Sequence, residues 1–322
     1  MTKIAILDDY QNVALEMAEW RSLPDDATVD VYAEHVFDED QLAVRLAGYD
    51  AVVAMRERTP FPRRLLERLP DLRLLITAGM RNASIDVDAA TELGITVCGT
   101  EGLPYPTAEL TWGLILAIAR RVPEEDKATR EGRWQVTLGE GLHGKTLGVI
   151  GLGRLGSQVA VVGKAFGMEV IAWSQNLTRE RADEIGATLV TKDQLLARSD
   201  YVTIHLVLSD RTRGLLGTSE LSSMKSTAYL INTSRGPIVD EDALVDAIQS
   251  GAIAGAGLDV FDQEPLAANH PLRNLDNTVI TPHMGYVTVE TYKIFYGHAL
   301  ENVQAFLDGA PLRTINEPRN AR

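Results

Sequence analysis

Cysteine is almost absent from the sequence, which has one, Cys98, in 322 residues. One thiol cannot close an internal disulfide or supply a multi-cysteine metal site, so disulfide-stapled folds and cysteine-based zinc modules are excluded. Such sparse cysteine usage fits a reducing compartment. The N-terminus also lacks the long apolar segment of a secretory signal and carries Asp8 and Asp9 early. We therefore expect a cytoplasmic protein.

Long apolar runs and an excess of positive charge are missing as well. The longest apolar run, residues 110–119, is about half of a membrane span, so we expect a buried helix there and no membrane partner. The chain has 31 basic and 45 acidic residues, a net charge of −14. A phosphate-backbone binder needs a basic face, so nucleic acid is not an expected partner. A few local arginines would still suffice to hold a small anion.

Histidine is scarce too, with six residues in the chain. Five of them show no metal-ligand spacing, and we expect no metal site; they are His35, His143, His205, His270 and His298. The sixth, His283, lies in ITPHMGY at 280–286, on a turn after a short apolar run. A solvated, capped turn is the simplest interpretation of that segment, and only its surroundings can favour another.

Short apolar strands alternate with helical patterns throughout the chain. This alternation predicts an α/β fold with parallel sheets covered by helices on both faces, and the length and the 45% hydrophobic content suggest about two domains. The expected strands are residues 3–7, 28–33, 51–54, 73–77, 95–98, 146–150, 168–173, 201–206, 227–233, 254–260 and 278–281. Residues 101–106 and 283–287 look like domain crossings. A final helix over 287–309 then returns to the first domain, which makes that domain discontinuous.

A glycine motif follows the strand at 146–150. Gly151, Gly153 and Gly156 form G-x-G-x-x-G between that strand and an amphipathic helix, which is the context that a dinucleotide site requires. The first glycine allows a tight turn, the second admits the pyrophosphate to the backbone, and the third lets helix pack on strand. The helix N-terminus favours the anion. The alternative is a glycine-rich turn that binds no ligand. A protein kinase loop is excluded, because the other kinase motifs are missing from the sequence.

Three further segments, each at the end of a predicted strand, carry residues suited to hydride transfer on a 2-oxo acid. Arg235 can hold a carboxylate through two hydrogen bonds. His283 can exchange a proton near neutral pH, and Glu264 can orient it and favour its charged form. Each residue alone could be a solvated turn residue. Ligands of open α/β sheets bind at this edge, which favours the three acting together.

The sequence resembles the D-isomer-specific 2-hydroxyacid dehydrogenase family over nearly its whole length. The resemblance rests on GLGRLG, HLVLSDRTRGLL, INTSRGPIVDEDAL, GAGLDVFDQEP and TPHMG, and more weakly on PTAEL and Asn302. It implies a Rossmann-type dinucleotide-binding domain of residues 101–288 inserted into a flavodoxin-like substrate domain of residues 1–100 and 289–322. It also implies a homodimer and the catalytic set Arg235, Glu264 and His283. Asp259 would contact the nicotinamide amide, with Thr107 near the same ring.

Two departures from the family pattern concern ligand binding. The usual substrate loop is replaced by TAGMRNASID, with Arg81 at the place of its first Asp, so the substrate-binding candidates are Gly79, Met80, Arg81, Arg235 and His283. At the end of the second cofactor-domain strand, Ser174 stands where an NAD-selective fold has a carboxylate for the ribose 2′-hydroxyl. Ser174 and the following amides can donate to a 2′-phosphate, with Arg179 and Arg181 nearby. We therefore expect NAD or NADP, with a preference for NADP; the alternative is that Ser174 bonds an NAD ribose or lies on a solvated turn.

Together, the motifs and the resemblance predict a set of cofactor-binding residues: Thr107, Gly151, Gly153, Arg154, Leu155, Gly156, Ser174, His205, Thr212, Thr233, Asp259, His283 and Gly285. The predicted function is reduction of a small anionic 2-oxo acid such as glyoxylate, hydroxypyruvate or phosphohydroxypyruvate. Formate or phosphonate oxidation on the same scaffold is an alternative, although formate enzymes of the family have Gln where Glu264 stands. A dinucleotide-sensing, corepressor-like module is the rival from another class.

Overall fold

The computed structural model describes residues 1–317 and forms two compact units. Within the described residues, unit 1 comprises residues 1–103 and 287–317, and unit 2 comprises Pro104–Tyr286. The domain boundaries expected from the sequence lie two or three residues from these. No helix within residues 1–317 is long and apolar enough to cross a membrane.

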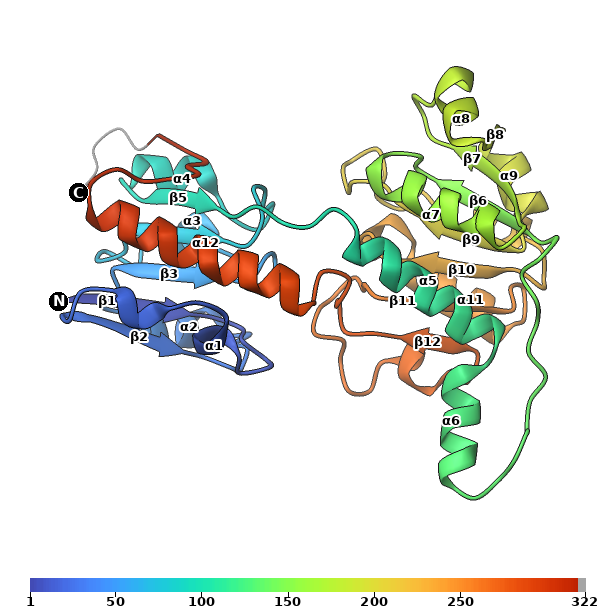
Figure 1. Cartoon of the computed structure of the whole chain (residues 1–322), viewed down its shortest axis with the longest axis horizontal. Coiled ribbons are helices and arrows are strands. Elements are labelled where there is room, and N and C mark those ends of the chain that lie inside the picture. Colours follow the sequence, from blue (N-terminus) through green and yellow to red (C-terminus); the bar gives the residue numbers. More distant parts are fainter. Residues whose placement is uncertain (318–322) are drawn as a thin grey trace. The chain divides into compact units, whose positions relative to one another are not determined.

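Unit 1 is built on a five-stranded sheet in the order β2-β1-β3-β4-β5, with every neighbouring pair parallel (Figure 1). The strands are β1 (Thr2–Ile6), β2 (Ala27–Val31), β3 (Ala51–Ala54), β4 (Leu74–Thr77) and β5 (Thr96–Gly99). This is the flavodoxin-like order, in which ligands bind beyond the carboxyl ends of the strands. The three strands β3, β4 and β5 are entirely buried, as expected for parallel strands covered on both faces.

The helices of unit 1 cover both faces of this sheet. They are α1 (Ala14–Met17), α2 (Glu39–Leu46), α3 (Arg63–Leu66), α4 (Val87–Glu92) and α12 (Val289–Leu307), with a 3-10 turn η1 (Trp20–Ser22). Helices α2, α3 and α4 bury Leu42, Leu65 and Ala89 in one core with alternate strand residues. Helix α12 lies on the sheet from the other side, where buried Asn302 donates to the Gly99 carbonyl at 2.8 Å. This bond ties α12 to β5.

Unit 2 is built on a seven-stranded, all-parallel sheet in the order β12-β11-β10-β9-β6-β7-β8 (Figure 1). The strands are β6 (Thr146–Ile150), β7 (Glu169–Trp173), β8 (Thr188–Leu189), β9 (Tyr201–Ile204), β10 (Tyr229–Asn232), β11 (Gly255–Leu258) and β12 (Thr278–Ile280). Counted from β6, this is the Rossmann order 3-2-1-4-5-6 with one further strand. The order reverses between β6 and β9, so a dinucleotide is expected at the carboxyl ends of those two strands.

The helices of unit 2 also form two layers. They are α5 (Pro106–Ala119), α6 (Val122–Arg130), α7 (Arg154–Ala165), α8 (Arg179–Ile185), α9 (Lys192–Arg198), α10 (Thr218–Ser223) and α11 (Glu241–Gln249), with 3-10 turns η2 (Gly236–Ile238) and η3 (Pro271–Asn274). Helices α5, α7 and α8 share one core with the sheet, whereas α9, α10 and α11 share the core of the opposite face. The α/β, doubly wound fold expected from the sequence is therefore confirmed.

Several strands are shorter than the apolar patterns suggested. Strand β9 ends at Ile204 and β11 at Leu258, although the apolar patterns continue to residues 206 and 260. After each of these points the chain leaves the ladder and forms a loop at the carboxyl edge of the sheet. Strand β8 has only two residues and was not expected, because two residues carry no periodicity. Apolar side chains beyond β9 and β11 therefore line loops, not strands.

Candidate active site

The glycine motif forms a tight turn between β6 and α7. Gly151 has a φ of +97°, and a Cβ there would lie 2.5 Å from the His205 carbonyl oxygen. A Cβ on Gly156 would lie 2.0 Å from the Gly151 carbonyl oxygen, so this position also admits only glycine. At Gly153 a Cβ would meet no atom within 4 Å. The first and third glycines thus bring strand and helix together, while the second faces open space.

The N-terminus of α7 is available to an anion. Gly153 is its N-cap and provides no side-chain hydrogen bond to the first turn, which contains Arg154 and Leu155. The first N–H groups of a helix have no intrahelical partner and carry the positive end of its dipole. A bare glycine cap in front of a helix of twelve residues leaves room for an anion at those groups.

The end of β7 places Ser174 beside a basic side chain. Ser174 follows the strand directly, is half-buried, and closes a turn in which its carbonyl accepts from the Leu177 N–H at 3.1 Å. Arg181 of α8 reaches back to α7, where its Nη2 donates to Ser157 Oγ at 3.4 Å, and its Nη1 pairs with Glu184 at 2.8 Å. Both arginines are exposed. Of the two arginines, only Arg181 is held against the first turns of α7.

The loop after β9 carries His205 and Thr212. The Thr212 hydroxyl donates to the Val207 carbonyl at 2.8 Å and accepts from the Ser209 N–H at 2.8 Å, which closes the loop. His205 Nε2 bonds Thr203 Oγ1 at 2.9 Å, whereas its buried Nδ1 has no partner within residues 1–317. Burial lowers the pKa of His205 to about 4, so its ring is neutral at physiological pH.

A buried carboxylate holds the turn that carries His283. Asp259 follows β11, is 1% exposed, and accepts three hydrogen bonds from the turn after β12. Its Oδ1 accepts from Thr281 Oγ1 at 2.6 Å and from the Met284 N–H at 2.8 Å, and its Oδ2 accepts from the Gly285 N–H at 2.8 Å. Burial raises the pKa of Asp259, and these donors oppose that shift. His283 is fixed by this turn with a φ of +52°.

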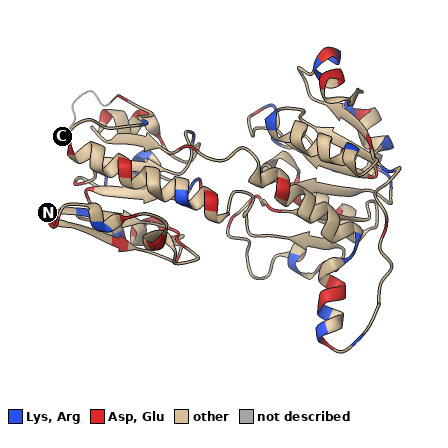
Figure 2. Cartoon of the chain, viewed as in Figure 1, with Lys and Arg blue, Asp and Glu red and all other residues tan. Residues whose placement is uncertain are grey.

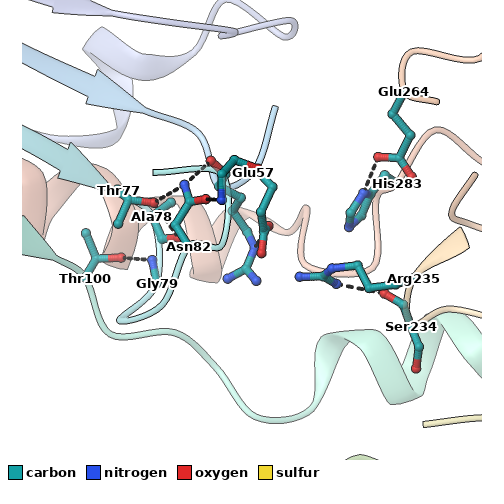
Figure 3. Close-up of polar contacts among 12 residues, drawn as sticks. Glu57, Thr77, Ala78, Gly79, Asn82, Thr100, Ser234, Arg235, Glu264 and His283 are labelled. Carbon is teal, nitrogen blue, oxygen red and sulfur yellow. Dashed lines mark hydrogen bonds and ion pairs between the residues drawn. The ribbon is translucent and has the colours of Figure 1, made fainter. Parts of the chain in front are cut away.

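His283 and Glu264 form a close pair (Figure 3). Glu264 Oε2 lies 2.5 Å from His283 Nδ1, and its Oε1 accepts from the Phe261 N–H at 2.9 Å. A ring whose Nδ1 is bonded to a carboxylate keeps one orientation and presents Nε2. Within residues 1–317, Nε2 makes no hydrogen bond. The geometry is that of an imidazole positioned to exchange a proton through Nε2.

Arg235 begins the turn after β10 in the same unit. Its Nη1 donates to the Ser234 carbonyl at 2.7 Å (Figure 3). Asn232 Nδ2 donates to the Arg235 carbonyl at 3.0 Å, and Asn232 Oδ1 accepts from the Ser234 N–H at 3.0 Å. The next residue, Gly236, can only be glycine, because a Cβ there would lie 2.1 Å from the Phe261 carbonyl carbon. The turns that carry Arg235 and Glu264 are therefore in direct contact.

The first turns of α5 contact the turns that follow β10 and β12. Thr107 Oγ1 donates to the Gly285 carbonyl at 3.1 Å, and Thr111 Oγ1 lies 2.8 Å from Thr233 Oγ1. These bonds join α5 to the turns after β12 and β10. Thr111 was missed by sequence reasoning, because nothing local distinguishes a buried threonine with a partner 122 residues away from a core residue.

Residues 112–285 match the NAD-binding domain of the D-isomer specific 2-hydroxyacid dehydrogenases. The chain is 48% identical over 263 residues to a glyoxylate reductase of Aeropyrum pernix, covering 78% of each protein. It belongs to this family. It is also 37% identical to a D-3-phosphoglycerate dehydrogenase of Synechocystis over 99% of its own length, but it spans only 56% of that protein. A phosphoglycerate oxidoreductase structure from Vibrio cholerae superposes with a TM-score of 0.91 at 38% identity, over 96% of this chain and 100% of that one.

The substrate-loop candidates of this dehydrogenase lie in unit 1, after β4. Gly79, with a φ of +90°, donates its N–H to Thr100 Oγ1 at 2.8 Å (Figure 3). Met80 and Arg81 are exposed, and Arg81 has no hydrogen bond or ion pair within residues 1–317. Asn82, which was not singled out from the sequence, bonds Thr77 and the carbonyl of Arg56. A substrate role for Gly79, Met80 and Arg81 stays a prediction.

The buried ring of His205 predicts a loss of stability in acid. The unfolded chain binds a proton on this histidine near pH 6.5, but the folded chain binds it only near pH 4. As the pH falls through that window, this group should lower the free energy of unfolding by about 1.4 kcal/mol per pH unit. We expect His205→Gln to show a correspondingly shallower decline in urea unfolding between pH 6.5 and 4.5. Parallel curves for the two proteins would show that His205 is solvated in the native state.

Proposed function

We propose that this dehydrogenase reduces a small anionic 2-oxo acid to the D-2-hydroxy acid, or catalyses the reverse oxidation, with a nicotinamide cofactor. The observation that carries the proposal is the 2.5 Å pair of His283 and Glu264, in the same unit as the glycine turn and Arg235. The relatives named above include glyoxylate reductase and D-3-phosphoglycerate dehydrogenase. Glyoxylate, hydroxypyruvate and phosphohydroxypyruvate are therefore the substrates to test.

The residues around the glycine turn fit a dinucleotide. Gly153 leaves its Cβ position open, and the first turn of α7 has no side-chain cap, so Gly153, Arg154 and Leu155 would hold the pyrophosphate. Thr107, Thr233 and Gly285, which are joined through α5, would lie around the nicotinamide. The loop of His205 and Thr212 borders the same turn through the His205 carbonyl. When bound, the nicotinamide would supply or accept the hydride.

The chain itself binds the acid and moves the proton. Arg235 would hold the substrate carboxylate with its planar guanidinium, which matches a carboxylate in two parallel bonds. His283 would give a proton to the carbonyl oxygen through Nε2, because Nδ1 is bonded to Glu264. The Glu264 carboxylate would keep the ring in one orientation before and after the transfer. Asp259 would serve chiefly to hold the His283 turn, since three donors of that turn already occupy its oxygens.

Replacing His283 tests this function. We expect His283→Ala to lower kcat by roughly 10²–10⁴ with NADPH or NADH and the best 2-oxo acid, because a positioned acid/base is lost. Dinucleotide binding, measured by fluorescence, should change little. His143→Ala, on an exposed residue before β6, serves as the control and should behave as wild type.

Two outcomes would count against the proposal. A near-wild-type kcat in His283→Ala would show that His283 is not the proton donor. The segment ITPHMGY would then be interpreted as a solvated turn. A wild type that binds the dinucleotide but turns over no member of a broad 2-oxo acid panel would favour a dinucleotide-sensing module instead.

We also propose a preference for NADP. Ser174 supplies a hydroxyl where a carboxylate would repel a 2′-phosphate, and Asn176 follows on the exposed part of the same turn. Arg181 supports the idea, because its guanidinium is held at the first turns of α7, beside the glycine turn. Its partner Glu184 offsets part of that charge. The preference expected is therefore modest.

A single substitution tests the cofactor preference. Wild type should use NADPH at least as well as NADH, and Ser174→Asp should shift the ratio of kcat/KM values toward NADH. Ser222→Asp, which adds the same charge to an exposed site on α10, should leave the ratio unchanged. The measurement is kcat/KM for both cofactors in all three proteins. A wild-type preference for NADH above about ten-fold, or about 1.4 kcal/mol, would contradict the proposal.

A homodimer is proposed from the segment that follows α5. Helix α6 and the loop after it extend away from the sheet of unit 2 (Figure 1), and Trp134 and Leu138 on this loop are 77% and 92% exposed. Charges of α6 are acidic in its first turn and basic in its last (Figure 2). Glu125 of α6 fixes the loop, because its Oε1 accepts from the Thr137 N–H at 2.6 Å and from the Thr137 hydroxyl at 2.5 Å. These hydrogen bonds also hold the pKa of Glu125 below its usual range. Two large apolar side chains exposed on one loop support an interface there.

Charged residues on this loop should separate the subunits. We expect Trp134→Glu with Leu138→Glu to convert a dimer to a monomer in sedimentation equilibrium, because two buried charges without partners oppose association. Val44→Glu is a matched control, since Val44 is also 77% exposed but lies on α2 of unit 1. A monomeric wild type, or a double variant that stays dimeric, would place the interface elsewhere.

A cytoplasmic location is part of the proposal as well. The single thiol, Cys98, is buried, and burial raises its pKa to about 11. A buried thiol with a high pKa is chemically inert and needs no oxidising compartment. This supports a protein that works where disulfides are not formed.

A further inference from the structure

Glu241, at the start of α11, lies outside the residues assigned to the reaction but bonds the loop that carries Glu264. Its Oε2 accepts from the Asp262 N–H at 3.1 Å, and its Oε1 lies 3.1 Å from His270 Nε2. Its side chain is only 17% exposed. Both carboxylate oxygens are therefore occupied, each by a different segment of unit 2.

His270 fixes Glu241 from the other side. The Leu272 N–H donates to His270 Nδ1 at 3.3 Å, which makes His270 the N-cap of η3. Since Nδ1 accepts this bond, Nε2 carries the proton and donates to Glu241. The ring thereby joins the turn before β12 to the N-terminus of α11, and it has one tautomer that satisfies both partners.

These bonds form a continuous path to the reacting imidazole. Glu241 holds the Asp262 N–H, the adjacent Phe261 N–H donates to Glu264 Oε1 at 2.9 Å, and Glu264 Oε2 holds His283 Nδ1. Gly236 lies on the same peptide, since a Cβ there would be 2.5 Å from the Asp262 nitrogen. A shift of this peptide would therefore displace Glu264 and disturb the turn of Arg235.

We propose that Glu241 and His270 are positioning residues that hold the Glu264–His283 pair in its reactive orientation. The proposal rests on the proposed function, because it assigns His283 the proton transfer. A carboxylate is required at position 241, since it can accept from two donors at once. A glutamine has one acceptor oxygen and would turn its amide group toward one of the two N–H donors.

Three variants separate this role from a general effect on packing. Glu241→Gln removes one of the two bonds with no change of size. His270→Asn keeps an acceptor for the Leu272 N–H, because Asn is a good N-cap, but is too short to reach Glu241. Asp242→Asn is the matched control: it removes an exposed carboxylate from the same helical turn, with no bond to Asp262 or His270.

The first measurement is steady-state kinetics with NADPH and the best 2-oxo acid. Glu241→Gln should lower kcat roughly ten- to a hundred-fold, as expected for a misplaced catalytic group, with KM changed less than about three-fold. His270→Asn should lower kcat in the same direction and Asp242→Asn should not. Wild-type kcat in Glu241→Gln, or an equal loss in Asp242→Asn, would overturn the proposal.

A double variant tests whether Glu241 acts through Glu264. In the Glu264→Gln background, adding Glu241→Gln should change kcat by less than about two-fold, because the group that it positions is already gone. If the two effects multiply instead, Glu241 has a separate structural role and the proposal is wrong.

A third readout does not depend on turnover. The proton between His283 Nδ1 and Glu264 should give a downfield ¹H resonance that shifts in Glu241→Gln and His270→Asn but stays at its wild-type position in Asp242→Asn. An unchanged resonance in Glu241→Gln would overturn the positioning role. If wild type reduces no 2-oxo acid, the proposed function fails, and this resonance still decides whether Glu241 orients His283.

Discussion

The site depends on one buried carboxylate. Asp259 is 1% exposed, and the Thr281 hydroxyl and the N–H groups of Met284 and Gly285 donate to it across the ends of β11 and β12. Those bonds hold His283 at a φ of +52°, a conformation that costs about 1–3 kcal/mol for a residue other than glycine. Bonds to a charged acceptor, each contributing about 1.5–3 kcal/mol, are enough to offset that strain. A ring held this way reaches Glu264 without any contribution from a ligand.

The parallel sheet gathers the remaining groups at the same edge. Gly151 follows β6, Ser174 follows β7, Arg235 lies just after β10, and Asp259 follows β11. Since all strands of unit 2 point one way, residues far apart in sequence arrive at one end of the sheet. Close packing then sets the spacing of the loops at this edge. The Gly151 backbone packs against the His205 carbonyl, and the Gly236 backbone packs against the Phe261 carbonyl. Larger residues at either glycine would push neighbouring loops apart.

Local rules explain what the sequence could predict. The order strand, G-x-G-x-x-G, helix is a contiguous pattern, so the turn at Gly151 and the α/β class could be predicted without a structure. Arg235, Glu264 and His283 were predicted as the catalytic set from their chemical type at strand ends, and this role stays a prediction. Partners distant in sequence could not be found this way: the Glu241 carboxylate meets His270 across 29 residues, and Thr111 meets Thr233 across 122. Asp259 was expected to contact the nicotinamide amide. The local sequence Leu258-Asp259-Val260 does not reveal that one hydroxyl and two backbone N–H groups of the turn after β12 donate to its carboxylate.

The proposed binding of anions to an acidic chain poses an apparent contradiction. The different ranges of the repulsive and attractive interactions resolve it. The net charge of −14 is spread over the surface and is screened beyond a Debye length of about 8 Å in physiological salt. In the proposed function, the bare N-terminus of α7 and the guanidinium of Arg235 would act at hydrogen-bond distance, where a donor is far more effective than a remote charge is repulsive. Selectivity for an anion would therefore come from fixed donors, and the acidic surface would act mainly on the rate of encounter. Because repulsion of that kind grows as salt is removed, association of anionic ligands should become faster, not slower, as ionic strength rises toward the physiological range.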